Sequence, residues 1–224
     1  MQQLKSFGPD IWTADGPIVR TMGIGFPTRM AVVRLGDGSL WINSPVQGSR
    51  EEIESVSVLG EVRHLVAPTA MHVWRLHDWA EVFPHAQRWG PPRPRSKDYD
   101  NVLTDAPVSG WSADLKQLVF RGNALLDEVH FLHERSGTVV IGDFIQTWPA
   151  QPGRPILNVL LKVAGVTEGG VPLDIKLSFW NRRLARESLE KLLTWDFDRL
   201  ILAHGPCVES AAKAFVRRAF RWLG

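Results

Sequence analysis

Two side chains that commonly ligate metals stand directly after short, strongly apolar runs of the sequence. His204 follows the run at 200–203, and Asp143 follows the β-branched run at 139–141 and one glycine. An unbroken apolar run of this length indicates a strand buried on both faces. In layered α/β folds, ligands and catalytic groups gather where such strands end. The pattern therefore suggests a site, although a histidine at a strand end can also simply bond a nearby backbone carbonyl.

Other chemistries find less support in the residues. The sequence has no Gly-x-Ser-x-Gly motif and no phosphate-binding loop. Cys207 is the single cysteine, which excludes an internal disulfide and a cysteine-rich zinc site. It lies three residues after His204, but we expect it to be a small core residue that begins the final helix.

Composition indicates an ordinary globular protein with a sizeable core. The chain has 224 residues, of which 44% are hydrophobic and 22% charged, and its net charge is +2. This balance points to neither nucleic acid nor a membrane surface as a partner, and we expect a small-molecule substrate or ligand instead. No signal-like or membrane-spanning run is evident, so we expect a cytoplasmic protein. Most of the ten tryptophans should be packing anchors.

The elements that must position these groups follow from hydrophobic patterning and turn residues. Alternating apolar runs around turns predict strands, apolar positions at helical spacing predict helices, and Ser49 with Glu52 predicts a capping box. In chain order we expect strands at 11–13, 18–20, 30–35, 39–43 and 62–67, a glycine-rich bend at 23–27, helices from Ser49 and over 72–82, and a loop at 90–100. In the second half we expect strands at 118–120, 128–133, 138–141 and 200–203, an irregular connection or lid at 148–170, and helices at 184–193 and 208–223.

The order of strands and helices, with polar groups at strand ends, resembles the metallo-β-lactamase-like superfamily, in particular a family within it described as a domain of unknown function. The stretches that carry the resemblance are PTRMAVVRLGDGSLWINSPV from position 27, LVAPTAMH at 65–72, FPHA at 83–86, SGTVVIGDF at 136–144 and WDFDRLILAHGP at 195–206. The resemblance covers nearly the whole chain. It implies an α+β fold, a four-layer αββα sandwich, formed by one domain over residues 1–224.

The resemblance also implies a ligand set, but most of it is missing. Active hydrolases of the superfamily use His-x-His-x-Asp-His after an early strand, whereas this chain has PTAMHVWRLHDW. Only His72 stands near the expected place, with His77 and Asp78 a helical turn or more beyond. A further histidine ligand would fall at Gly122-Asn123, where there is none.

Two strand-end residues match the superfamily directly. Asp143 corresponds to the bridging aspartate and His204 to the last histidine ligand, so we expect both to be catalytic. With His72 they form the predicted metal set of two histidines and one carboxylate, which suits zinc or iron. His130 and His133 should point to opposite faces of a strand, which makes them a poor pair of ligands.

The reduced ligand set leaves three functions open. The first is a metal-dependent hydrolase with at most one zinc or iron ion. The second is a metal-free protein of the same fold that binds a small molecule in the old cleft. The third is a scaffold that uses exposed tryptophans and the basic face of the final helix, although a solvated face is the better interpretation of those charges.

Overall fold

Two mixed β-sheets form the centre of the protein. The structure is a computed structural model, and it describes residues 1, 3–21, 24–148 and 150–224. The first sheet has the order β1-β2-β5-β6-β7-β8-β9 and the second the order β10-β11-β12-β13. The strands of the first sheet are β1 Lys5–Gly8, β2 Ile11–Asp15, β5 Arg29–Arg34, β6 Leu40–Asn43, β7 Val62–Val66, β8 Gln87–Gly90 and β9 Asn101–Val102. Those of the second are β10 Leu115–Phe120, β11 Glu128–His133, β12 Thr138–Ile141 and β13 Arg199–Leu202.

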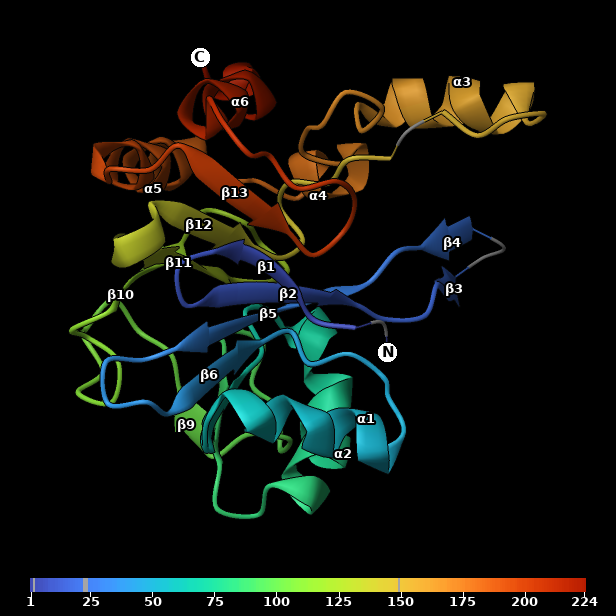
Figure 1. Ribbon diagram of the computed structural model, residues 1–224. Helices are drawn as coiled ribbons and strands as arrows, with labels where there is room; N and C mark the ends of the chain where they lie inside the picture. The colour runs from blue at the N-terminus through green and yellow to red at the C-terminus, as the bar shows by residue number, and fades with distance from the viewer. Residues whose placement is uncertain (2, 22–23, 149) are drawn as a thin grey trace.

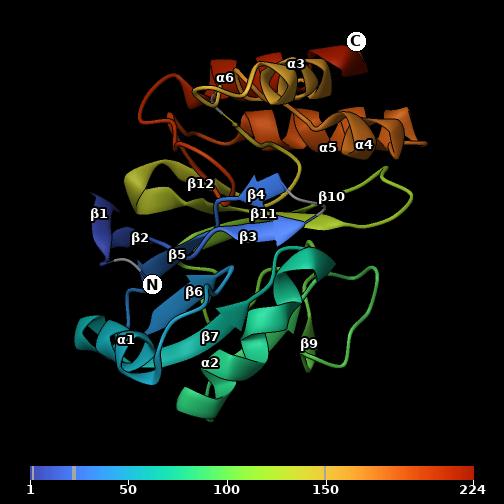
Figure 2. The same ribbon diagram turned by 90° about the vertical axis from the view of Figure 1, so that its right-hand side faces the viewer.

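Helices cover the outer faces of the two sheets (Figures 1 and 2). On the first sheet lie α1 Arg50–Glu54, the 3-10 turns η1 Ser55–Leu59 and η2 Ala70–Arg75, and α2 Leu76–Val82. On the side of the second sheet lie α3 Pro155–Ala164, α4 Leu173–Leu177, α5 Arg182–Thr194, α6 Ala212–Ala219 and the 3-10 turn η4 Arg221–Leu223. The short hairpin of β3 Val19–Thr21 and β4 Ile24–Phe26 and the 3-10 turn η3 Glu134–Ser136 complete the elements.

Alternation along the strands divides the interior into three apolar clusters. In β12, Val139 and Ile141 pack toward α5 and α6, whereas Val140 packs between the sheets. In β5, Val32 packs toward α1 and α2 and Val33 packs between the sheets. Three separate cores require four layers, so the predicted αββα sandwich is confirmed.

The pairing of β12 with β13 brings the two strand-end residues to the same edge. These strands are parallel, with Thr138 opposite Arg199 and Ile141 opposite Leu202. Parallel neighbours end at the same edge, so the residues that follow them emerge side by side although they are far apart in sequence.

Most predicted elements are confirmed, including the capping box at Ser49. The predicted glycine-rich bend begins at Gly23, outside the described residues, and 24–26 form β4. Two predictions were wrong. The region 148–170 contains α3, because Pro155 suits the first turn of a helix and Gly165 ends it in the left-handed conformation.

The second correction concerns the end of the chain. The final helix begins at Ala212, and neither the turn after His204 nor Cys207 starts it. The intervening segment turns back instead, and Val208 exchanges backbone hydrogen bonds with Leu200 of β13 (2.8 and 2.9 Å). The backbone groups of this segment are thus satisfied by a strand edge, which competes with helix formation.

A buried histidine far from the strand ends predicts a pH-dependent stability. His64 packs against Trp111, and burial lowers its pKa to about 4. Below pH 6.5 the unfolded chain takes up a proton that the folded protein resists, so the free energy of unfolding should fall between pH 6.5 and about 4. We expect His64→Leu to remove about 1–3 kcal/mol of this dependence in urea titrations, because each unit of pKa difference between the folded and unfolded states corresponds to about 1.4 kcal/mol. His85→Leu, at an exposed histidine, is the control, and equal pH profiles for the two variants would contradict the assignment.

Candidate metal centre

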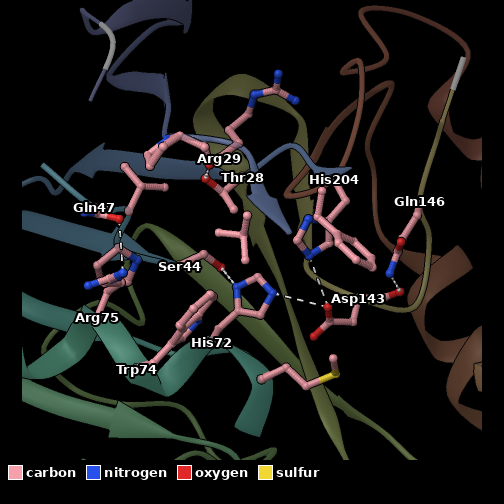
Figure 3. Close-up of a pocket in the computed structure, with 16 residues that line it drawn as sticks. Thr28, Arg29, Ser44, Gln47, His72, Trp74, Arg75, Asp143, Gln146 and His204 are labelled. Atoms are coloured by element: carbon pink, nitrogen blue, oxygen red, sulfur yellow. Dashed lines mark hydrogen bonds and ion pairs between the residues drawn. The ribbon is translucent and has the colours of Figure 1, made fainter. Parts of the chain in front are cut away.

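Three ligating side chains from separate parts of the chain meet at one edge of the sandwich (Figure 3). His72 belongs to η2, Asp143 follows β12, and His204 follows β13. One carboxylate oxygen of Asp143, Oδ1, lies 3.3 Å from Nε2 of His72 and 3.2 Å from Nε2 of His204. The three ligand atoms lie within 4.8 Å of one another. The structure thus brings together all three residues of the predicted metal set.

The orientation of His204 suits metal ligation. Its Nδ1 lies 2.7 Å from the carbonyl oxygen of Pro27. A carbonyl can only accept, so Nδ1 carries a proton and donates it to Pro27; Nε2 faces Asp143, where it donates to the carboxylate when the ring is protonated and can ligate an ion when the ring is neutral. The outer hydrogen bond of metal-ligating histidines has this form. A hydrogen bond from His204 to a nearby backbone carbonyl was the alternative to a site in the sequence analysis. The structure contains that bond, and it orients His204 within the site.

His72 has an equivalent outer partner. Its Nδ1 lies 2.7 Å from the hydroxyl oxygen of Ser44, which also accepts a hydrogen bond from Asn43 Nδ2. Ser44 directly follows β6 and has a φ of 55°, a left-handed conformation that is uncommon outside glycine. Such a conformation persists only where its surroundings hold it, and here it places the hydroxyl beside the imidazole. Both histidines therefore present Nε2 to the same carboxylate.

Asp143 is buried and remains ionised. The hydroxyl of Thr69, also buried, donates a hydrogen bond to Oδ2, which leaves Oδ1 for the two imidazoles. Burial alone would raise the pKa of Asp143, but the charges and hydrogen bonds of His72 and His204 outweigh it and lower the pKa well below its ordinary value. Burial likewise acts to lower the pKa of His204, and Asp143 outweighs it and raises that pKa.

A second buried carboxylate holds the turn that carries Asp143. Glu128, at the start of β11, is fully buried and accepts backbone N–H groups from Gly142 (2.6 Å), Asp143 (3.0 Å) and Phe144 (2.6 Å). Three such bonds stabilise the charged form of a carboxylate and fix the backbone that donates them. We call this arrangement the Glu128 clamp. Sequence reasoning missed it, because the donors are 14 to 16 residues away.

The turn that carries His204 is anchored by Arg29. This guanidinium donates to the backbone carbonyls of Leu202 (3.0 Å) and Gly205, and it pairs with Asp15 at 2.7 Å. Gly205 has a φ of 114°, and a Cβ at this position would lie 2.0 Å from the carbonyl oxygen of Thr147. The glycine after His204 is therefore required by close backbone approach, which the sequence motif alone did not reveal.

A cavity of about 170 Å³ opens in front of the ligand atoms. Its lining is mainly apolar, with His72, Asp143 and His204 at the inner wall and Arg75 and Gln47 to one side (Figure 3). The remaining lining residues are Pro17, Val19, Phe26, Thr28, Arg29, Ser44, Pro45, Val46, Met71, Trp74 and Gln146. A mostly apolar pocket with a few convergent polar groups is typical of small-molecule sites.

The other residues considered as ligands lie elsewhere. His77 is exposed and pairs with Glu81 at 3.1 Å, and Asp78 pairs with Arg75 at 2.8 Å. Where a further histidine ligand was expected, Asn123 instead bonds Ser178 and serves the packing of α4. Cys207 lies beside Arg29, and burial raises the pKa of its thiol, which argues against a nucleophile.

His130 and His133 are not part of the converging group of His72, Asp143 and His204, although Nε2 of His130 lies 3.2 Å from Oε1 of Glu128 in the clamp. The His130 ring is fully buried against Phe120 and Phe144, whereas His133 bonds the hydroxyl of Ser136. Their different surroundings agree with the opposite faces expected from their odd spacing on β11.

Solved structures with this arrangement define the fold class. The chain superimposes on a flavodiiron protein from Giardia intestinalis with a TM-score of 0.72 and 13% identity, covering 100% of this chain and 60% of that one. It superimposes on a metallo-β-lactamase from Pontibacter korlensis with a TM-score of 0.66 and 11% identity, covering 100% and 99%. A metallo-β-lactamase from Erythrobacter litoralis gives 0.64 and 13%, covering 98% and 91%. The protein therefore has the metallo-β-lactamase fold, and it spans 60% to 63% of the flavodiiron proteins it matches.

Sequence comparison then identifies the family. Residues 9–164 match the model of the family Domain of unknown function (DUF4336), so the chain belongs to that family. No curated protein matches significantly in sequence. The predicted resemblance is thereby confirmed, and the site retains only a partial ligand set, two histidines and one aspartate.

The Glu128 clamp can be tested by a substitution that keeps its shape. In Glu128→Gln an amide NH₂ would face backbone N–H donors, and buried donors would lose a charged acceptor. We expect the free energy of unfolding to fall by about 2–3 kcal/mol in urea titrations. Glu134→Gln, at a half-exposed carboxylate paired with Lys116, should change it by less than about 1 kcal/mol. Equal unfolding midpoints for the two variants would show that the clamp contributes nothing.

Proposed function

We propose that this protein is a metal-dependent hydrolase that holds a single zinc or iron ion on His72, Asp143 and His204 and acts on a small molecule. The observation that carries the proposal is the orientation of the two imidazole rings. Each has its Nδ1 engaged by an outer partner, and each presents Nε2 to Oδ1 of a buried, ionised aspartate. Two histidines and one carboxylate, with further positions open, form a donor set used by catalytic zinc and iron.

The residues present fit one ion and not two. Within residues 1, 3–21, 24–148 and 150–224, His72, Asp143 and His204 are the group of potential ligands that converge, and no further histidine, cysteine or acid joins them. The second carboxylate oxygen of Asp143 is engaged by Thr69. A second ion would therefore lack its own protein ligands, so we assign a mononuclear site.

The chain's own residues would bind and orient both ion and substrate. When bound, the ion supplies a Lewis acid and lowers the pKa of a water ligand. Thr69 and the Glu128 clamp hold the aspartate, while Ser44 and the Pro27 carbonyl hold the imidazoles. The apolar wall of the cavity would take the substrate body. Arg75, held by Asp78 (2.8 Å) and Gln47 (3.1 Å), offers cationic donors at one side.

A second function, binding of a small molecule without a metal, is favoured by one electrostatic feature. The raised pKa of His204 and the lowered pKa of Asp143 mean that a proton on the imidazole can neutralise the buried carboxylate. Burial of a charge then needs no ion. Under this alternative the cavity remains a ligand site, and the three side chains provide packing and polar contacts.

Metal content decides between the two functions. For the untagged protein produced with added zinc or iron, we expect one ion per chain by elemental analysis. Asp143→Asn and His204→Ala should each weaken zinc binding by more than about 100-fold, because even outer partners of ligands contribute roughly 10- to 100-fold. His77→Ala, at an exposed histidine outside the site, is the matched control and should bind as the parent protein does. Two tightly held ions, or none in the parent protein, would overturn the proposal.

Reactions that depend on a second ion should be slow. A single ion cannot clamp both the attacking and the leaving group. In spectrophotometric assays we therefore expect weak or absent hydrolysis of a β-lactam and of a glutathione thioester. Any activity found on another small ester, amide or thioester should disappear in His204→Ala and persist in His77→Ala. Rapid β-lactam turnover by the parent protein would contradict this expectation, and elemental analysis would then show whether one ion or two supports it.

A further inference from the structure

Helix α3 carries a stripe of large apolar side chains that face solvent. Ile156 is 78% exposed, Val159 62%, Leu160 58% and Val163 66%. Their spacing of three, four and seven residues places them on one side of the helix. The other side packs inward through Leu161. In Figure 1 this helix projects beyond the body of the protein at its outermost layer.

Further exposed apolar side chains lie in the elements that follow α3. Leu177, the last residue of α4, is 69% exposed, and Trp180 shortly after it is 82% exposed. Among the described residues, seven of the twelve exposed large apolar side chains lie between positions 156 and 180. Exposed large apolar side chains are thus concentrated in this part of the chain, and the stripe on α3 is the kind of exposed apolar feature that marks an interaction surface.

A cationic hollow adjoins the same helix. Its volume is about 270 Å³, and it is lined by Lys162 of α3, Lys176 of α4, Arg218 of α6 and Arg221 of η4. In the described part of the chain, none of these four side chains forms an ion pair with an acid. Glu168 is the single acidic residue in the lining. Four cations against one acid give the hollow an excess of positive charge, which attracts phosphate-bearing groups.

Exposed apolar side chains next to a cationic hollow indicate which partner would bind here. We propose that the α3 surface, formed by α3, Leu177, Trp180 and the cationic hollow, docks onto the surface of an anionic lipid bilayer. Apolar side chains that enter the acyl boundary beside cations that meet lipid phosphates are the two components of interfacial membrane binding. None of the described helices is long and apolar enough to span a bilayer, so α3 would lie along the surface.

A second copy of the chain fits this surface less well. The ten residues of α3 alone form a patch of roughly 15 by 10 Å, far below the roughly 800 Å² per partner of a stable interface, so a dimer would have to bury the cationic hollow as well. Self-association through this side would also bring two cationic hollows together, and like charges repel. An anionic bilayer provides an apolar interior for the exposed side chains of α3 and negative charge for the cations of the hollow.

Cosedimentation with vesicles tests the proposal directly. At low ionic strength the 224-residue chain should sediment with vesicles that contain about one-third phosphatidylserine, and much less with pure phosphatidylcholine vesicles. Added salt should release it, because screening weakens the cationic contribution. Light scattering of the protein alone should give the mass of one chain. Failure to sediment with the anionic vesicles, or a dimer that Leu160→Ser dissociates, would overturn the proposal.

Two pairs of exposed substitutions separate the apolar and cationic contributions. Leu160→Ser with Val163→Ser removes apolar area, and Lys162→Glu with Arg221→Glu reverses two charges. Each pair should reduce binding to anionic vesicles by about tenfold or more. Val58→Ser and Lys97→Glu make the same kinds of change at exposed positions elsewhere and should bind as the parent protein does. Binding that survives both α3-surface pairs would refute the assignment of this surface.

Discussion

The carboxylate of Glu128 is the interaction on which the site depends. It is fully buried, and it accepts the N–H groups of three consecutive residues at the end of β12. These donors would otherwise be unpaired where the strand stops, so the clamp replaces the lost strand partners with a charged acceptor. Because the middle donor belongs to Asp143, the direction of that side chain follows from the clamp. The position of one ligand is thus decided in the interior, behind the site.

The charge of Asp143 organises the groups in front of it. A carboxylate buried between two imidazoles is stabilised by their hydrogen bonds. It holds the Nε2 atoms of both rings 3.2 to 3.3 Å from one of its oxygens. Thr69 takes the other oxygen, and Pro27 and Ser44 fix the far nitrogens of the rings. Every polar atom of the triad therefore has a defined partner, which preorganises the site before any ion arrives.

The sequence predicts the features that depend on local periodicity. Short β-branched and apolar runs predict β12 and β13, and the polar residue after each run becomes a site residue. His72 is harder to place, since it lies in a 3-10 turn whose geometry no apolar pattern specifies. Glu128 and Arg29 contact backbone groups that are remote in sequence, so no spacing rule finds them. The prolines and glycines of the region 148–170 indicate an irregular connection, whereas in the structure Pro155 and Gly165 mark where helix α3 begins and ends.

The location of each ligand outside the hydrogen-bonded strands has an evolutionary consequence. His72, Asp143 and His204 occupy three different connections, and none of them belongs to the apolar clusters that hold the layers together. Natural selection can therefore add or delete ligands one connection at a time without passing through an unfolded intermediate. A lineage can lose some residues of a site, keep others and retain the scaffold unchanged. The partial triad of this protein is the kind of outcome that such separation permits, and the same separation leaves the path open in the opposite direction.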